Sequence, residues 1–140
     1  MKREAVVAEA RKWLGKKWQH QARGPDAVDC IGLIQVVGDA FALEYEDIQG
    51  YARTPNGLHF LNHLRKYLVR VPLNTTNRLG CIAVFSQGKF PCHVGFFSER
   101  FGVDHIIHSR ASAKKVVEEI LQANNGFILT EILAFPGLED

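Results

Sequence analysis

The sequence has little of several features that mark whole classes of protein. It holds only three cysteines in 140 residues. An odd number without framework spacing excludes a disulfide scaffold and favours synthesis in a reducing compartment. No run approaches the roughly 18 apolar residues that cross a bilayer, so membrane insertion is not expected. The net charge of +2, with acidic and basic residues interspersed, implies no attraction to nucleic acid.

The N-terminus also lacks the apolar core of a signal peptide, because Glu4, Glu9 and Arg11 interrupt the apolar residues there. We therefore expect synthesis in the cytoplasm without a signal peptide, which does not exclude later release by an assembly or by lysis. The composition, 46% apolar and 23% charged, is typical of a soluble globular protein. The length suits one domain, residues 1–140, with a single core.

The pattern of apolar residues predicts helices first and strands after. Helical spacing covers residues 3–14, about 30–43 and about 57–69. Turn-like segments at 86–89 and 99–102 separate runs that are typical of strands. These runs are Cys81–Phe85, Cys92–Ser98, Val103–His108, Val116–Ile120 and Phe127–Ala134. Helices followed by an antiparallel meander predict an α+β fold.

The most informative stretch is Asp29-Cys30-Ile31-Gly32-Leu33, where a turn-rich polar segment gives way to an apolar run of helical length. A thiol at a helix N-terminus faces backbone N–H groups and the positive end of the helix dipole. Both favour the thiolate, which is the nucleophilic form. We therefore predict that Cys30 is a nucleophile. The alternative is a buried structural cysteine, since free cysteine is among the most buried residue types.

Two histidines on predicted neighbouring strands extend this pattern. His93 begins His93-Val94-Gly95-Phe96, and His108 lies in Ile106-Ile107-His108-Ser109. Cysteine, histidine and second histidine, in that order, is a pattern of thiol hydrolases. His93 would take the proton of Cys30, and His108 would orient the His93 ring. The alternative for His93 is an inert hydrogen bond to backbone. His105 competes with His108, but an offset of three residues puts them on opposite faces, so only one can point at His93.

These motifs resemble the NlpC/P60 superfamily of papain-like cysteine peptidases. The family's Asp-Cys-x-Gly-Leu, His-Val-Gly-Phe and Phe-Ile-His-Ala motifs are similar to the stretches around Cys30, His93 and His108, and Gly80–Phe85 resembles a fourth. The resemblance implies a papain-like α+β fold, with N-terminal helices packed on an antiparallel β-meander. It also implies a triad of Cys30, His93 and His108, selecting His108 over His105, and a peptidase without a cofactor.

The segment Trp13–Gln21 resembles more narrowly the branch of phage cell-wall peptidases, and Val116–Glu119 and Ile132–Pro136 also fit it. This resemblance implies a thiol amidase that cuts the peptide stem of peptidoglycan, often between D-γ-glutamyl and a diamino acid. It also implies other tail or hub proteins as partners. The expected location is the tail of a virion or phage-like particle, which would deliver the enzyme to the cell wall.

Five residues near the motifs are candidates for substrate binding: Trp18, His20, Arg23, Asp29 and Arg110. Arg23 and Arg110 would suit an acidic stem peptide, and the alternative is an ordinary surface arginine. Trp18 stands where the family usually has a tyrosine whose hydroxyl contributes to the substrate pocket. Tryptophan offers only an N–H donor.

A metal site is not expected. His59 and His63 are four residues apart on a predicted helix, but no third ligand is evident nearby. A zinc site built from Cys30, His93 and His108 is the alternative, and the sequence lacks the paired spacing of structural zinc. Two other functional classes stay open. One is a structural tail or hub module, and the other is an acyltransferase or toxin that passes the thioester to an acceptor other than water.

Overall fold

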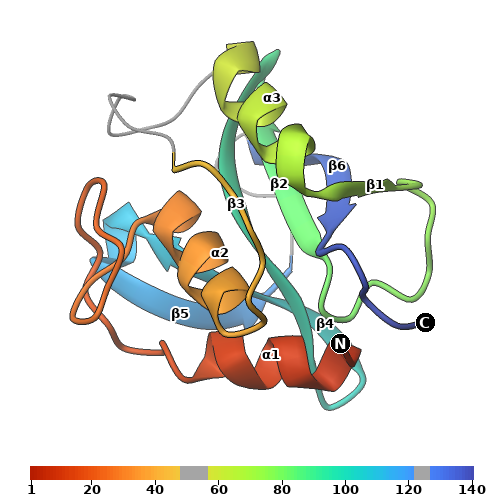
Figure 1. Ribbon diagram of the computed structural model, residues 1–140, viewed down its shortest axis with the longest axis horizontal. Coiled ribbons are helices and arrows are strands. Elements are labelled where there is room, and N and C mark those ends of the chain that lie inside the picture. The colour runs from red at the N-terminus through yellow and green to blue at the C-terminus, as the bar shows by residue number, and fades with distance from the viewer. Residues whose placement is uncertain (48–56, 122–126) are drawn as a thin grey trace.

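The computed structural model describes residues 1–47, 57–121 and 127–140, with the side chains of 57–60 and of Phe127 outside the described residues. Within them, three helices and a six-stranded antiparallel sheet confirm the predicted α+β class (Figure 1). The helices are α1 (Arg3–Arg11), α2 (Cys30–Asp39) and α3 (Gly57–Tyr67). The strands are β1 (Val69–Val71), β2 (Ile82–Gln87), β3 (Phe90–Arg100), β4 (Val103–Arg110), β5 (Lys115–Ile120) and β6 (Phe127–Ala134), with a 3-10 helix at Ala111–Ala113.

The strand order β1-β6-β2-β3-β4-β5 departs from a continued meander. Strands β2 to β5 follow one another as expected, but β6 returns to pair with β2 instead of β5. The physical reason lies in β6 itself, where Ile132 and Leu133 point to opposite faces of the sheet and are both 0% exposed. A strand with buried side chains on both faces needs packing on both sides of the sheet. A position next to β5 would place it at the edge of the sheet. The short strand β1, which the sequence pattern missed, pairs with the other side of β6.

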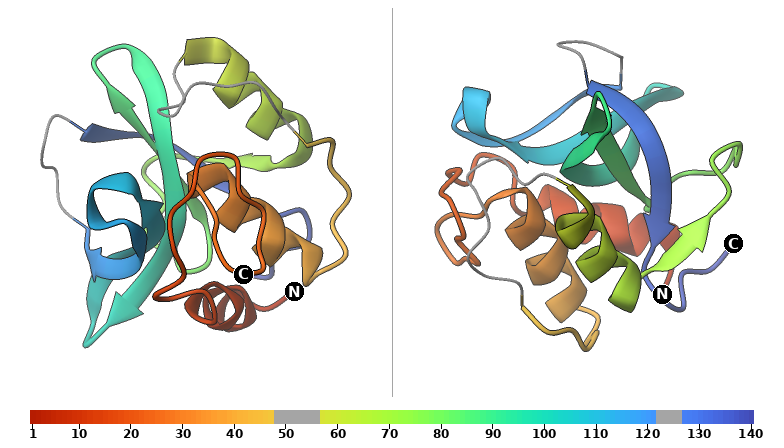
Figure 2. Two further views of the ribbon diagram at one scale, coloured as in Figure 1. Left: turned by 90° about the vertical axis from the view of Figure 1, so that its left-hand side faces the viewer. Right: turned by 90° about the horizontal axis from the view of Figure 1, so that it is seen from above.

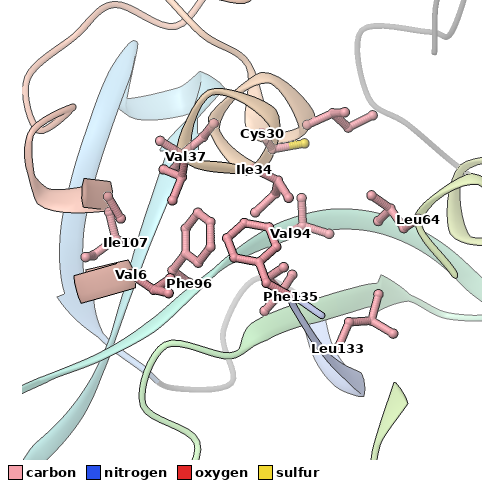
Figure 3. Packing of buried hydrophobic residues seen from close by; sticks show 14 of the residues in the cluster. Val6, Cys30, Ile34, Val37, Leu64, Val94, Phe96, Ile107, Leu133 and Phe135 are labelled. Carbon is pink, nitrogen blue, oxygen red and sulfur yellow. The ribbon is translucent and has the colours of Figure 1, made fainter. Parts of the chain in front are cut away.

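The main core lies between the helices and one face of the sheet. Figure 2 shows the three helices gathered on that side. Val6 of α1, Ile34 and Val37 of α2, and Val94 and Phe96 of β3 belong to this core (Figure 3). The other face carries a smaller apolar cluster of Cys81, Ala83, Phe85, Phe97, Ile106, Ile132 and Ala134. The first core holds α2 against β3 and β4, the strands that carry His93 and His108.

The loop between α1 and α2 is held by backbone hydrogen bonds within itself and to the residue before β5. The N–H of Trp18 donates to the carbonyl of Lys114 at 3.0 Å, and the N–H of Val28 donates to the carbonyl of Lys17 at 3.0 Å. The loop therefore joins the start of β5 to the residues that precede Cys30. Within the described part of the chain, no helix is both long and apolar enough to cross a membrane.

Candidate active site

Cys30 is the first residue of α2, where the sequence predicted a helix start. The preceding Asp29 is the N-cap: its Oδ1 accepts the N–H of Gly32 at 2.7 Å. This bond satisfies one of the donors that the first helical turn leaves without an intrahelical partner. Asp29 Oδ2 accepts the N–H of Gln21 at 2.8 Å, which ties the loop to the cap. Asp29 therefore fixes the place of Cys30.

Gly32 permits the loop to approach this helical turn closely. A Cβ at position 32 would lie 2.1 Å from the carbonyl oxygen of Ala22 and 3.1 Å from Asp29 Oδ1. Real Cβ atoms do not come that close to a backbone oxygen, so another residue would displace the loop from the helix. The glycine of Asp-Cys-x-Gly thus has a packing role next to the cysteine.

The Cys30 sulfur is buried and contacts the start of β3. The side chain is 4% exposed, and the thiol has backbone hydrogen bonds from Val94 and Ile31. Figure 3 shows Cys30 on α2 in the same cluster as Val94 of β3. Because Val94 directly follows His93, this contact brings the nucleophile candidate to the histidine's part of the strand.

The helix start does not by itself set the protonation of Cys30, because burial opposes its effect. Burial, and after it the charge of Asp29, raises the pKa of the thiol from 9.0 to about 12. The hydrogen bonds from Val94 and Ile31 lower the pKa, as the helix-start argument predicts, but they do not offset burial. The resting group is a neutral thiol, so a base must remove its proton during the reaction.

His93 and His108 lie in direct contact. His93 Nε2 and His108 Nδ1 are 2.7 Å apart, and the two rings meet edge to face with centroids at 4.9 Å. His105 instead has its Nδ1 2.9 Å from the carbonyl oxygen of Val103 and pairs with Ser98 across the strands. The structure therefore brings His108, and not His105, to His93.

Gly95 leaves the space that this contact needs. It lies two residues after His93, on the same face of β3. A Cβ there would be 2.9 Å from the Cβ of His108, from Ile106 Cγ1 and from the carbonyl oxygen of Ile107. The glycine of His-Val-Gly therefore lets β4 approach closely enough for His108 to reach His93.

Burial favours the neutral form of both histidines. Burial, followed by the electrostatic effects of His108 and Arg110, lowers the pKa of His93 from 6.5 to about 3. Burial also lowers the pKa of His108, while the hydrogen bond and charge of Glu119 raise it. A neutral imidazole has one N–H and one acceptor nitrogen, so the hydrogen bonds determine which nitrogen of each ring carries the proton.

Glu119 begins this hydrogen-bond chain. Its Oε1 lies 2.7 Å from His108 Nε2, and a carboxylate can only accept, so Nε2 of His108 is the donor. His108 Nδ1 then accepts the N–H of His93 Nε2. The remaining nitrogen of His93, Nδ1, is therefore the unprotonated one, and it is the atom suited to take a proton from Cys30. We assign these tautomers from the hydrogen-bond network.

Glu119 was missed in the sequence, although its strand was predicted. Glu118 and Glu119 are adjacent and face opposite sides of β5. Glu118 accepts hydrogen bonds from Arg11, Ser98 and Arg100. Glu119 accepts hydrogen bonds from His108 and Arg110. Strand alternation assigns the two carboxylates to different faces, but only the pairing of β4 with β5 identifies which one meets His108.

The predicted substrate-binding residues lie around this site, and several are held by other side chains. Arg23 contacts Asp29 at 3.0 Å and Asp47 at 3.1 Å, so Asp29 is both a helix cap and an ion-pair partner. Arg110 Nη1 is 3.1 Å from both oxygens of Glu119. Trp18 and His20 are partly buried in the loop before the cysteine. The binding roles of Trp18, His20, Arg23, Asp29 and Arg110 stay predictions.

Cys81 and His63 pack in other parts of the protein. Cys81 is buried in the smaller cluster, and the ring of His63 packs on Tyr67 with centroids at 5.5 Å. The side chain of His59 lies outside the described residues. Among residues 1–47, 57–121 and 127–140, no three His, Cys, Asp or Glu side chains gather as a metal site.

Solved structures share this architecture. NlpC2 of Trichomonas vaginalis superposes with a TM-score of 0.71 at 18% identity, over 95% of this chain and 45% of that chain. An N-acetylmuramoyl-L-alanine amidase of Bacteroides uniformis gives 0.65 at 15% identity, over 95% of this chain and 98% of that chain. The chain has the NlpC/P60 fold.

The same fold also exists without catalysis. RipD of Mycobacterium tuberculosis, described as a non-catalytic NlpC/p60 domain protein adapted to peptidoglycan binding, superposes with a TM-score of 0.63 at 14% identity, over 96% of both chains. This chain spans less than half the length of NlpC2. Its sequence matches no protein-family model and no curated protein. At these identities the comparisons establish the NlpC/P60 fold, and the activity must be argued from the site.

Proposed function

We propose that the protein is a cysteine peptidase that hydrolyses the peptide stem of peptidoglycan. The observation that carries the proposal is that Cys30 on α2 packs against β3 beside His93, where a chain of hydrogen bonds to β4 and β5 begins. The Cys30 thiol lies at Val94, the neighbour of His93, and His93 contacts His108, which contacts Glu119. This arrangement supplies a nucleophile, a base and a group that orients the base.

The reaction follows from the neutral resting state. As the Cys30 sulfur attacks the amide carbonyl, His93 Nδ1 takes the thiol proton. The tetrahedral intermediate then breaks its C–N bond, and the His93 imidazolium protonates the departing amine. A water molecule, deprotonated by the same imidazole, attacks the thioester, which releases the carboxylic acid and restores the thiol.

The developing oxyanion needs hydrogen-bond donors. The backbone N–H of Cys30 is our candidate because the first N–H groups of a helix have no intrahelical partner and α2 begins there. A donor of this kind stabilises the transition state by about 3–4 kcal/mol.

The proposal also names the bond that is cut and the particle that carries the enzyme. We favour the bond between D-γ-glutamyl and the diamino acid of the stem, on the resemblance of the motifs around Cys30, His93 and His108. The resemblance of Trp13–Gln21 to phage cell-wall peptidases supports a tail component. In this account the protein is made in the cytoplasm, joins other tail or hub proteins, and reaches the cell wall with the particle.

Defined muropeptides test the proposed bond. Purified protein is incubated with the tripeptide L-alanyl-D-γ-glutamyl-diaminopimelate, the matching lysine tripeptide and N-acetylmuramoyl tripeptide, and products are identified by mass spectrometry. The proposal predicts L-alanyl-D-glutamate from the two free tripeptides, N-acetylmuramoyl-L-alanyl-D-glutamate from the third substrate, and the free diamino acid from all three. Release of the whole peptide from the muramic acid would contradict the bond. A new amide or ester on the acyl fragment would indicate transfer instead of hydrolysis.

The second candidate is a non-catalytic module that binds peptidoglycan, which the fold of RipD favours. The hydrogen bond between His93 and His108, next to the strand residue that Cys30 contacts, argues against it. A sedimentation assay with insoluble peptidoglycan separates the two. Stable binding by wild type and Cys30→Ala alike, with no fragments released from any substrate, would support the binding module and overturn the peptidase.

A further inference from the structure

We propose that Glu119 is a positioning residue of the site, which holds His108 in the Nε2–H tautomer and is itself held by Arg110. The inference deepens the proposed peptidase function and rests on it for its consequence in catalysis. Its structural part, the tautomer of His108, stands independently of any substrate.

The position of Glu119 is set by the pairing of β4 with β5. His108 is opposite Val117 and Ile106 is opposite Glu119, so Glu119 is the diagonal neighbour of His108 on the same face. The contact is short, 2.7 Å from Oε1 to Nε2. His108 is 8% exposed, so its ring depends on these protein partners for hydrogen bonds.

The tautomer of His108 decides the state of His93. With its proton on Nε2, His108 presents Nδ1 as an acceptor, and His93 must place its own proton on Nε2. If His108 instead carried its proton on Nδ1, His93 Nε2 would have to accept, and the His93 proton would move to Nδ1. That form of His93 cannot take the proton of Cys30. Glu119 therefore acts on the base through one intervening ring.

Arg110 completes the arrangement from the solvent side. Its Nη1 contacts both oxygens of Glu119 at 3.1 Å, which restricts rotation of the carboxylate toward water. The side chains of Glu119 and Arg110 are 39% and 35% exposed. Substitutions there do not open the core, so loss of folding is not the expected result.

The variants separate the hydrogen-bond acceptor from the charge. Glu119→Ala removes both, whereas Glu119→Gln keeps a carbonyl acceptor for His108 Nε2–H. Glu99→Gln is the matched control, because Glu99 is an exposed acidic residue of β3, which β4 separates from β5. Thermal unfolding monitored by circular dichroism verifies that each variant is folded.

The first readout is the tautomeric state, from long-range ¹H–¹⁵N NMR spectra of the histidine rings. We expect Nε2–H for both His93 and His108 in wild type, Glu119→Gln and Glu99→Gln. In Glu119→Ala we expect His108 to lose this single tautomer. A protonated Nδ1 of His108 in wild type, or an unchanged tautomer in folded Glu119→Ala, would overturn the proposal.

The second readout is the turnover of peptidoglycan fragments. Glu119→Ala should lower kcat about 10- to 100-fold with little change in KM, as substitutions of such supporting groups typically do, and Glu119→Gln should restore most of it. In a His108→Ala background Glu119→Ala should have no further effect, because both changes break one chain. If the two substitutions instead lowered kcat by independent factors that multiply in the double variant, Glu119 would not act through His108. If wild type cleaves nothing while the tautomers are as predicted, the peptidase function fails and the role of Glu119 at His108 stands.

Discussion

The thiol of Cys30 on α2 is hydrogen-bonded to the backbone of Val94 on β3, the residue after His93. The packing of α2 on β3 thus sets the position of Cys30 relative to His93. The loop 15–28, the N-cap Asp29 and the core beneath α2 all hold that packing. Changes far from the sulfur should therefore alter its chemistry.

The first prediction concerns the protonation of Cys30. A thiol pKa of about 12 and a His93 pKa of about 3 mean that both groups are uncharged between these values. Alkylation by iodoacetamide follows the thiolate fraction, so the rate at Cys30 should rise about tenfold per pH unit from neutral pH to pH 10. Peptide mapping by mass spectrometry measures it. A rate that is constant from pH 5 to 8 would indicate a thiolate–imidazolium pair.

Asp29→Asn tests the electrostatic part of this prediction. The charge of Asp29 raises the Cys30 pKa, whereas an asparagine side chain still caps helices. Removal of the charge should lower the thiol pKa and shift the alkylation profile to lower pH. A profile that stays in place, in a folded variant, would show that burial alone sets the pKa.

Gly95→Ala should separate His108 from His93. The new Cβ would lie 2.9 Å from the His108 Cβ and from the carbonyl oxygen of Ile107, so β4 must shift. Overpacking of this kind costs about 1–3 kcal/mol of unfolding free energy, and we expect kcat to fall at least as much as in Glu119→Ala. Urea unfolding and turnover measure the two effects.

Gly38→Ala is the matched control for this glycine. Its Cβ would meet only ordinary contacts, 3.6 Å from Phe135 at the nearest, and it lies inside α2. Alanine in a helix is favoured over glycine by about 1 kcal/mol, so stability should be unchanged or higher. Full activity of Gly95→Ala would contradict the account of the His-Val-Gly motif.

The lowered pKa of Glu118 predicts that acid reduces the free energy of unfolding. Burial alone would raise its pKa, but hydrogen bonds from Arg11, Ser98 and Arg100 lower it from 4.5 to about 2. A lowered carboxyl pKa means that the unfolded chain binds the proton more readily. The stabilisation is therefore complete above about pH 4.5 and is lost as the pH falls toward 2. Urea unfolding of wild type and Glu118→Gln should differ at pH 6 and converge near pH 2.5. Equal stability of the two at pH 6 would refute this role.

Local sequence signals predicted the parts of the site that depend on local structure. Asp29 before an apolar run predicted the start of α2 at Cys30, and strand alternation separated His105 from His108. These features depend on neighbours within a few residues. The partner of His108 does not, because Glu118 and Glu119 are adjacent residues of the same type and only the register of β5 on β4 shows which one meets His108.

Tertiary burial accounts for the expectations that differ from the structure. The helix start at Cys30 favours a thiolate, but α2 packs its first turn on β3 and removes the sulfur from water. The strand β1 has three residues and a partner, β6, more than sixty residues later, so its own sequence carries little signal. The position of β6 beside β2 likewise follows from packing on both faces of the sheet.

Digestion of purified peptidoglycan tests the central claim most directly. Wild type, Cys30→Ala and Cys81→Ala are compared, with released fragments identified by mass spectrometry. Cys81 is a buried thiol of the smaller cluster, so its substitution controls for the loss of any cysteine. The account predicts stem-peptide fragments from wild type and Cys81→Ala, and none from Cys30→Ala. Equal release by folded Cys30→Ala, or no release by folded wild type, would contradict it.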